Sequence, residues 1–229
     1  MMNMKKKGIY ETLSRSPVFK GMNPLEIEGI LKRVPHRMIT YKKGNIIAFR
    51  GDPCERLLVL IEGDVRGEMV DFDGKAIEVE TISAPKPIAP AFIFGEKNVF
   101  PVDVVANRQV LVLSIPKNSL IQLFQVNKTV LNHFLNIVSS KAHFLSERLW
   151  FMSFKTIKEK LAHYIFRLLK PGEDTLILPK NQQELSEFFG VSRPSLARVI
   201  RDLERDQIIH HHRREIVIKD LKKLKEILH

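Results

Sequence analysis

The amino-acid sequence predicts an α+β fold, with an N-terminal antiparallel β-roll of the cupin-like type, a long helix and a C-terminal winged helix-turn-helix. Short runs rich in Ile, Val and Phe alternate with Gly-bearing turns from His36 to Leu113, as in antiparallel sandwiches or barrels. An apolar heptad stripe follows, and after it come two short helical patterns joined by a tight turn. The predicted domains are the β-roll with an N-terminal helix at 1–116, the long helix with its lead-in at 117–152, and the winged helix-turn-helix at 153–229.

Composition favours a folded protein with a polyanionic partner. At 229 residues and 44% hydrophobic content, the chain can bury one large or two modest cores. The net charge of +11 favours nucleic acid first. Residues 153–229 hold 16 basic and 11 acidic side chains, against 21 and 15 in residues 1–152. Because the excess is spread along the chain, the placement of the arginines matters more than their number.

Several classes of protein are excluded by what the sequence lacks. No apolar run approaches the length of a membrane span, and the basic N-terminus has no apolar core after it, so we expect a cytoplasmic protein without a membrane partner. The single cysteine, Cys54, leaves no intramolecular disulfide and no Cys-rich metal site.

The N-terminal half is expected to begin with a helix and continue as short strands. Residues 17–35 are predicted to be helical, with Asn23 as the cap and Pro24 at the first helical position. Turns between strands are expected at Gly44, Gly51-Asp52-Pro53, Gly63-Asp64, Asp73-Gly74 and Gly95. Three prolines interrupt the pattern, so 83–95 is predicted to be an irregular loop or a short helix.

The long helix carries an apolar stripe with spacings of 4, 3, 4, 3, 4 and 3 residues, which is typical of a two-stranded coiled coil. We expect a homodimer interface at Leu131, Leu135, Val138, Ala142, Leu145, Leu149 and Met152. A second apolar set lies beside it, at Phe134, Ile137, Phe144 and Phe151. Two apolar faces need two packing partners. The alternative is one wide face packed within the monomer.

The most informative segment is Asn181–Leu203. Its first helix has an apolar side, and Gly190 ends that helix in a position suited to a left-handed backbone. Ser192 caps a second helix, and Pro194 falls in the first turn, where a missing N–H costs little. The second helix is expected to bury Leu196, Val199, Ile200 and Leu203, leaving Arg193, Ser195, Arg198 and Arg201 outside.

This arrangement predicts a helix-turn-helix that places its second helix in the major groove of DNA. Arg193 and Arg198 are expected to read bases, because a guanidinium group can donate two hydrogen bonds to a guanine edge. Contacts to the DNA backbone are expected from Asn181, Gln182, Ser192, Ser195, Arg201 and Arg214. The alternative is an ordinary helical hairpin with a solvated basic face.

Further elements surround this segment. A helix over Thr156–Leu169 and a short strand at Leu176–Leu178 precede it. After it, the segment "QIIHHHRREIVI" predicts two short strands joined by a turn, and this hairpin would form the wing. Asp220 is expected to cap a last short helix.

The order of elements resembles the cyclic-AMP receptor protein/Fnr superfamily of bacterial transcription regulators. The resemblance is carried by "YKKGNIIAFRGDPCERLLVLIEGDV" with "DFDGK", and by "VSRPSLARVIRDLERDQII", and it extends from about Phe19 to the end. It implies a β-roll with the cyclic-nucleotide-binding-domain fold, a two-fold dimer on an inverted repeat of double-stranded DNA, and RNA polymerase as a partner.

The sequence departs from this family at the residues that bind the nucleotide. Ala89-Pro90 stand where the family has the Gly-Glu pair for the ribose, and Phe100-Pro101 where it has the Arg-Ser pair for the phosphate. Because a buried phosphate without its Arg is costly, we expect no bound cyclic AMP and no cofactor, and the effector stays unknown. An apolar pocket, or simply filled core, is expected at Ile88, Phe92, Phe94, Val99 and Phe100.

Other functions fit the residue counts poorly. A haem sensor would need an axial ligand, and a cupin-like metalloenzyme or ligand-binding protein with a helical appendage, the alternative function, would need several convergent metal ligands. His36 is the only histidine of the β-region. We therefore expect no catalytic residues and no metal site, and place His210–His212 in the wing near DNA phosphates.

Overall fold

The computed structural model describes residues 2–70, 73 and 75–228. The chain divides into two compact units, Met1–Lys141 and Ala142–His229, each with its own hydrophobic core. The division falls inside helix α4 (Lys128–Ser153), because the two halves of that helix pack on different cores. The predicted domain limits at 116 and 152 fall instead at the end of strand β8 and close to the end of α4.

Two four-stranded antiparallel sheets form the body of the first unit, which confirms the predicted β-architecture. One sheet has the order β1-β8-β3-β6, from β1 (Arg37–Tyr41), β8 (Val110–Pro116), β3 (Arg56–Glu62) and β6 (Lys86–Ile88). The other has the order β2-β7-β4-β5, from β2 (Ile46–Ala48), β7 (Asp103–Ala106), β4 (Asp64–Val70) and β5 (Ala76–Ser83).

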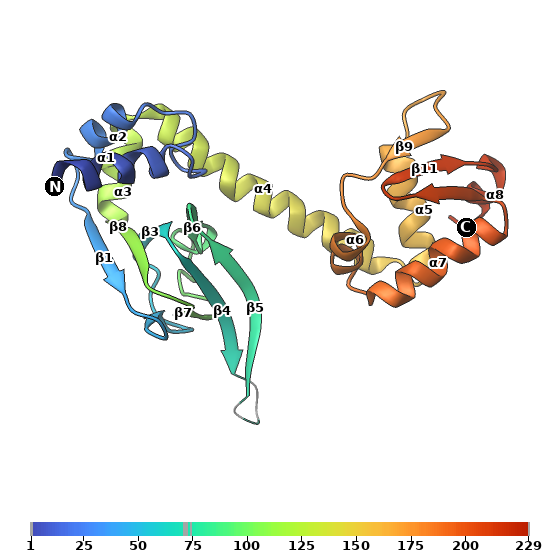
Figure 1. Ribbon diagram of the computed structural model, residues 1–229, viewed down its shortest axis with the longest axis horizontal. Helices are drawn as coiled ribbons and strands as arrows, with labels where there is room; N and C mark the ends of the chain where they lie inside the picture. The colour runs from blue at the N-terminus through green and yellow to red at the C-terminus, as the bar shows by residue number, and fades with distance from the viewer. Residues whose placement is uncertain (1, 71–72, 74, 229) are drawn as a thin grey trace. The chain divides into compact units, whose positions relative to one another are not determined.

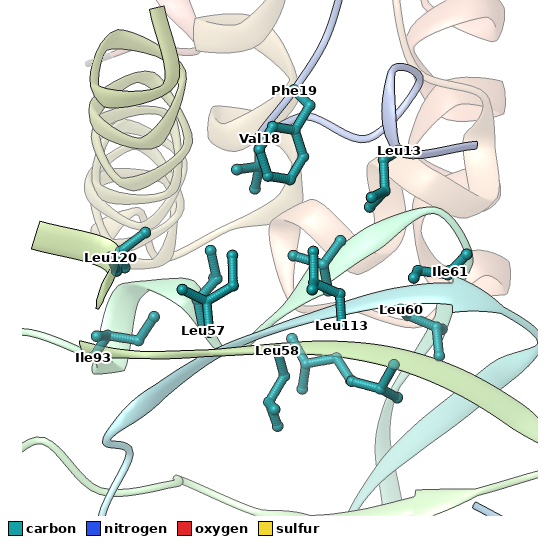
Figure 2. Packing of buried hydrophobic residues seen from close by; sticks show 14 of the residues in the cluster. Leu13, Val18, Phe19, Leu57, Leu58, Leu60, Ile61, Ile93, Leu113 and Leu120 are labelled. Carbon is teal, nitrogen blue, oxygen red and sulfur yellow. The ribbon is translucent and has the colours of Figure 1, made fainter. Parts of the chain in front are cut away.

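Helices cover one face of the first sheet. α1 (Met2–Leu13), α2 (Pro24–Leu31) and α3 (Lys117–Val126) gather at one end of the strands (Figure 1). Figure 2 shows Val18 and Phe19 from the N-terminal segment facing Leu57 and Leu113 of the sheet. The five central residues of β3 are all buried, because side chains on both of its faces enter the core.

The N-terminal prediction was correct in its cap and wrong in its extent. The side chain of Asn23 accepts a hydrogen bond from the Leu25 N–H at 2.9 Å, and Pro24 begins α2. The helix spans eight residues only, because the preceding segment folds as turns in which Gly21 has a positive φ of 75°. The earlier helix α1 was not predicted.

The remaining predictions for the first unit concern its loops. The proline-interrupted segment contains the expected short helix, the 3₁₀ helix η1 (Pro90–Phe92), but also strand β6, which was not predicted. The turn expected at Asp73-Gly74 joins β4 to β5, but Asp71, Phe72 and Gly74 lie outside the described residues.

The second unit is a winged helix-turn-helix. It contains the C-terminal half of α4 and the helices α5 (Ile157–Leu168), α6 (Gln182–Phe189), α7 (Arg193–Arg205) and α8 (Leu221–Glu226). A three-stranded sheet of order β10-β11-β9 is built from β10 (Ile209–His212), β11 (Glu215–Ile218) and β9 (Thr175–Ile177). Figure 1 shows α7 running along one side of this sheet. An aromatic cluster of Phe151, Phe188 and Phe189 fills the core.

Candidate nucleic-acid interface

Local hydrogen bonds define the two helices of the helix-turn-helix. Asn181 and Glu184 form a reciprocal capping box at the start of α6, with bonds of 2.9 and 2.7 Å. Gly190 ends α6 in the left-handed region, with φ 67°. Ser192 caps α7 by accepting from the Ser195 N–H, and the hydroxyl oxygens of these two serines lie 2.7 Å apart. The turn and both caps therefore match the local chemistry of the sequence.

Helix α7 buries one side and presents arginines on the rest of its surface. Leu196, Ile200 and Leu203 are buried, whereas Val199, expected among them, is only half-buried. The outer residues Arg193, Arg198 and Arg201 are exposed. In the described part of the chain none of these three arginines forms an ion pair. Their guanidinium groups are therefore available to acceptors on another molecule.

Arg205, on the same helix, is an arginine that does form ion pairs. Its guanidinium group lies 3.1 Å from Asp202 and 3.5 Å from Asp206. It sits in the last turn of α7, at the end opposite the Ser192 cap. Arg205 is therefore a natural reference for the three arginines that lack such partners.

The residues expected to contact the DNA backbone lie at the starts of the two helices and in the wing, except Arg201, which lies in the second half of α7. Asn181 and Ser192 are exposed caps, and Gln182 and Ser195 are half-buried in the first turns of α6 and α7. Arg214, in the wing turn, lies 4.0 Å from Glu184 of α6. The structure thus brings Arg214 beside the start of α6, where free backbone N–H groups favour an anion.

Two lysines of this unit were missed by sequence reasoning. The Lys180 ammonium group lies 5.2 Å from the centroid of the Phe188 ring, just before the cap of α6. Lys160 of α5 is buried and donates to the Phe189 carbonyl oxygen at 3.0 Å. Lys160 lies four residues before Tyr164, another buried residue of α5, but this spacing alone does not distinguish a buried lysine from a solvated one.

Helix α4 has two apolar faces, as its sequence predicts. Phe134 packs against the rings of Phe94 and Phe124 in the first unit, and Phe151 against Phe188 in the second. Most of the heptad stripe lies on the other face, and Val138 also packs against the core of the first unit. Leu131 and Val138 are half-buried, Ala142 is exposed, and four large side chains are 49–68% exposed: Leu135, Leu145, Leu149 and Met152.

The β-roll positions that match the family's nucleotide ligands have a distinctive geometry. Ala89 adopts φ 46° and ψ 40°, a left-handed conformation that favours glycine. Phe100 is buried, and its backbone N–H and C=O pair with the Asp52 carbonyl and the Gly51 N–H, both at 2.9 Å. A phenyl ring therefore stands at the position matched to the phosphate-binding Arg.

Of the five residues expected to line an apolar pocket or to fill core, Ile88, Phe94 and Phe100 lie in or against the β-roll core. A cavity of about 160 Å³ in the β-roll is lined by Phe100 but by none of the other four; its polar lining residues are Tyr41, Asp52, Arg56 and Ser114. Ile88 is core, and Phe94 packs against two other rings. Phe92 and Val99 are exposed by 37% and 38%.

The described residues lack two further kinds of feature, a membrane-spanning helix and a cluster of metal ligands. No described helix is both long and apolar enough to cross a membrane. Within the same residues, no three side chains of His, Cys, Asp or Glu are grouped so that they could hold a metal ion.

The fold and this basic helix define a winged-helix DNA-binding protein with a cyclic-nucleotide-binding-type β-roll. Residues 38–127 match the cyclic nucleotide-binding domain, and residues 159–227 match the Crp-like helix-turn-helix domain. The chain belongs to the Crp/Fnr superfamily of DNA-binding transcription regulators.

Individual relatives agree with this assignment. A transcriptional regulator from Thermotoga maritima is 35% identical with a TM-score of 0.51, covering 56% of this chain and 97% of its own. The catabolite activator protein of Thermus thermophilus has a TM-score of 0.53 at 19% identity, covering 93% of this chain and 98% of its own, and so supports the fold. The cAMP-activated global transcriptional regulator CRP of Pasteurella multocida is 24% identical over 183 residues, which are 78% of this chain and 88% of that protein.

Proposed function

We propose that this protein is a homodimeric regulator that binds an inverted repeat in duplex DNA through α7, and whose β-roll does not bind a cyclic nucleotide in the family's usual way. The observation that carries the proposal is the surface of α7. Arg193 and Arg198 are exposed without an ion-pair partner among the described residues, on a helix that is capped and anchored by its other side.

The arginines of α7 and the residues around them contact different parts of the DNA. Arg193 and Arg198 read base edges, since a guanidinium group matches the two acceptors of guanine in the major groove. Arg201, Arg214 and the polar residues at the helix starts hold phosphates, which fix the register but carry no direct sequence information. Pro194 lies between the two reading arginines and its side chain offers neither donor nor acceptor, so that part of the half-site goes unread.

The dimer is supported by the exposed stripe on α4. Leu145 and Leu149 are 49% and 68% exposed in the single chain. Large apolar side chains at heptad spacing become buried when two such helices pair. A two-fold dimer places two copies of α7 on half-sites whose centres lie about one turn of DNA, roughly 34 Å, apart.

The proposal about the effector rests on the β-roll. The cavity of about 160 Å³ is small compared with ordinary ligand pockets of about 300–1,000 Å³. Phe100, at the position matched to the family's arginine, lines that cavity and cannot form an ion pair with a phosphate. Arg56 also lines the cavity, but it comes from strand β3 and not from that position. If a ligand regulates the protein, it binds through other chemistry.

RNA polymerase is proposed as a partner because the similar proteins are named as transcriptional regulators.

Selection of binding sites from a random duplex library tests the proposal. The expected product is an inverted repeat, bound with an affinity that falls steeply as salt rises, because each phosphate contact adds about −0.9 to the slope of log K against log salt. A selected pool without two-fold symmetry would contradict the proposed dimer on DNA. Binding that is insensitive to salt would contradict the proposed interface.

A further inference from the structure

Lys160 of α5 is the one charged residue that is buried in the part of the chain the structure describes. Only 9% of the residue is exposed, and its ammonium group donates to the Phe189 carbonyl oxygen at 3.0 Å. Removing an ammonium group from water is expensive, and an apolar side chain of similar length could fill the same space. The charge therefore calls for an explanation beyond packing.

The acceptor is a carbonyl at the C-terminus of α6. The last carbonyl groups of a helix accept no hydrogen bond from within the helix, and they lie at the negative end of the helix dipole. Two of these carbonyls are satisfied locally: Ser186 accepts from the Val191 N–H at 3.0 Å and Glu187 from the Gly190 N–H at 3.2 Å. The Phe189 carbonyl receives its hydrogen bond from Lys160, across from another helix.

Phe189 stands at the point where the direction of the chain changes. Gly190 follows it in the left-handed conformation, and Ser192, three residues after Phe189, caps α7. A shift of the Phe189 carbonyl is therefore transmitted through a very short turn to Arg193, the first residue of α7. A charge-assisted hydrogen bond limits such a shift more strongly than an apolar contact, because it is directional.

We infer that Lys160 is a positioning residue for DNA recognition: its buried ammonium group fixes the turn between α6 and α7, and thereby the direction in which α7 presents its arginines. This role presupposes the proposed DNA binding. The residue itself touches no DNA. It determines how well the specific sequence is distinguished from other sequences.

Lys158 provides a matched control on the same helix. Its ammonium group lies 3.7 Å from Asp206, at the far end of α7, with both side chains about 40% exposed. An exposed pair of this kind contributes little to stability. Replacing Lys158 removes the same charge from the same domain but leaves the Phe189 carbonyl satisfied.

The experiment compares full-length wild type, Lys160→Met, Lys160→Arg and Lys158→Met on the selected inverted repeat and on a scrambled duplex. Lys160→Met should lower the ratio of specific to non-specific affinity by roughly tenfold, about the effect of one mismatched base pair. Its non-specific affinity should match that of Lys158→Met. Lys160→Arg keeps a charged donor and should recover most of the ratio.

Three results separate the possible failures. If wild type itself does not prefer the inverted repeat, the proposed function fails. If wild type does, and Lys160→Met melts at a lower temperature but keeps the ratio where it is fully folded, Lys160 is only a stabilising residue and the inference is overturned. Should Lys160→Met not fold, Lys160→Gln retains a neutral donor, and a full wild-type ratio in that variant would also overturn the role of the charge.

Discussion

Arg198 occupies the side of α7 that faces away from its anchoring residues Leu196, Ile200 and Leu203. At 100° per residue its direction lies on the far side of the helix from that buried set. It is exposed and has no ion-pair partner in the described structure, unlike Arg205 in the last turn. At the scale of single residues, this difference in ion pairing predicts that Arg198, and not Arg205, recognises a base.

Arg198→Ala should therefore cost about 1–3 kcal/mol on the selected site and relax the preference at one base pair. Binding to a panel of single-base variants of the selected site measures both effects. Arg205→Ala removes an equal charge from the same helix and should leave every base preference in place. An Arg198→Ala protein with intact preferences would mean that α7 reads DNA with another face.

Cys54 provides a residue-scale test of the β-roll core. The thiol is fully buried, and this burial raises its pKa to about 11 from an ordinary value of 9.0. The folded state then holds the thiol proton more tightly than the unfolded state does. The stabilisation is fully present below pH 9 and is lost as pH rises toward 11, by about 2–3 kcal/mol.

Urea unfolding of wild type and Cys54→Ala between pH 8 and about pH 11 checks this sign. The wild type should lose more of its free energy of unfolding over that interval, because only it carries the thiol. Alkylation of the folded wild type at pH 8 should also be slow compared with the unfolded chain. A constant difference between the two proteins across the interval would argue against a buried, protonated thiol.

At the scale of secondary-structure elements, α4 has two apolar faces, and the single chain covers only one of them. Phe134 and Phe151 anchor its two halves in separate cores, and this uses one face. The heptad stripe on the other face exposes Leu145, Leu149 and Met152. Serine residues occupy one flank of the stripe at 139, 146 and 153, and Lys141 and Arg148 occupy the other, so a parallel pair of helices would set each cation opposite a serine of the partner.

Replacing both Leu145 and Leu149 with Asp should convert the dimer to a monomer, because four carboxylates would be buried at the paired seam. Sedimentation velocity measures the assembly state, and loss of binding to the inverted repeat should accompany it. Leu221→Asp, at an exposed leucine of α8, is the control and should change neither property. A double variant that sediments as an intact dimer would place the interface elsewhere.

The whole molecule combines a nucleotide-type β-roll with a DNA-binding unit, and the ligand positions have diverged. Ala89 keeps a left-handed backbone at the position matched to the family's glycine, while Phe100 replaces the expected arginine. This divergence is the basis of our proposal that the β-roll uses a different ligand or none.

Cyclic AMP and cyclic GMP should consequently produce no saturable heat in calorimetric titration of the full-length protein. They should also leave its thermal stability unchanged, whereas a ligand present at 100 times its dissociation constant would add about 2.7 kcal/mol. The cAMP-activated regulator from Pasteurella multocida is the positive control under the same conditions. Micromolar binding of either nucleotide would refute the proposal.

Features that depend on neighbouring residues could be predicted from the amino-acid sequence alone. The Asn23 and Ser192 caps, the Gly190 turn, the wing and the alternation of strands and turns follow from contacts a few residues apart. Periodicity likewise separated the two faces of α4 and the arginines of α7 from the buried leucines. These features are local, so a pattern of residue types suffices to predict them.

Which side chains pack together depends on the folded chain and could not be predicted from the sequence. For Phe94 the sequence left a pocket and a filled core open, and its ring packs against Phe134, forty residues further on. The polar helix α1 and the buried Lys160 were missed for the same reason, because each depends on partners distant in sequence: α1 packs its last residue, Leu13, in the β-roll core, and Lys160 reaches Phe189. Burial is a property of the packed chain, and a local pattern does not contain it.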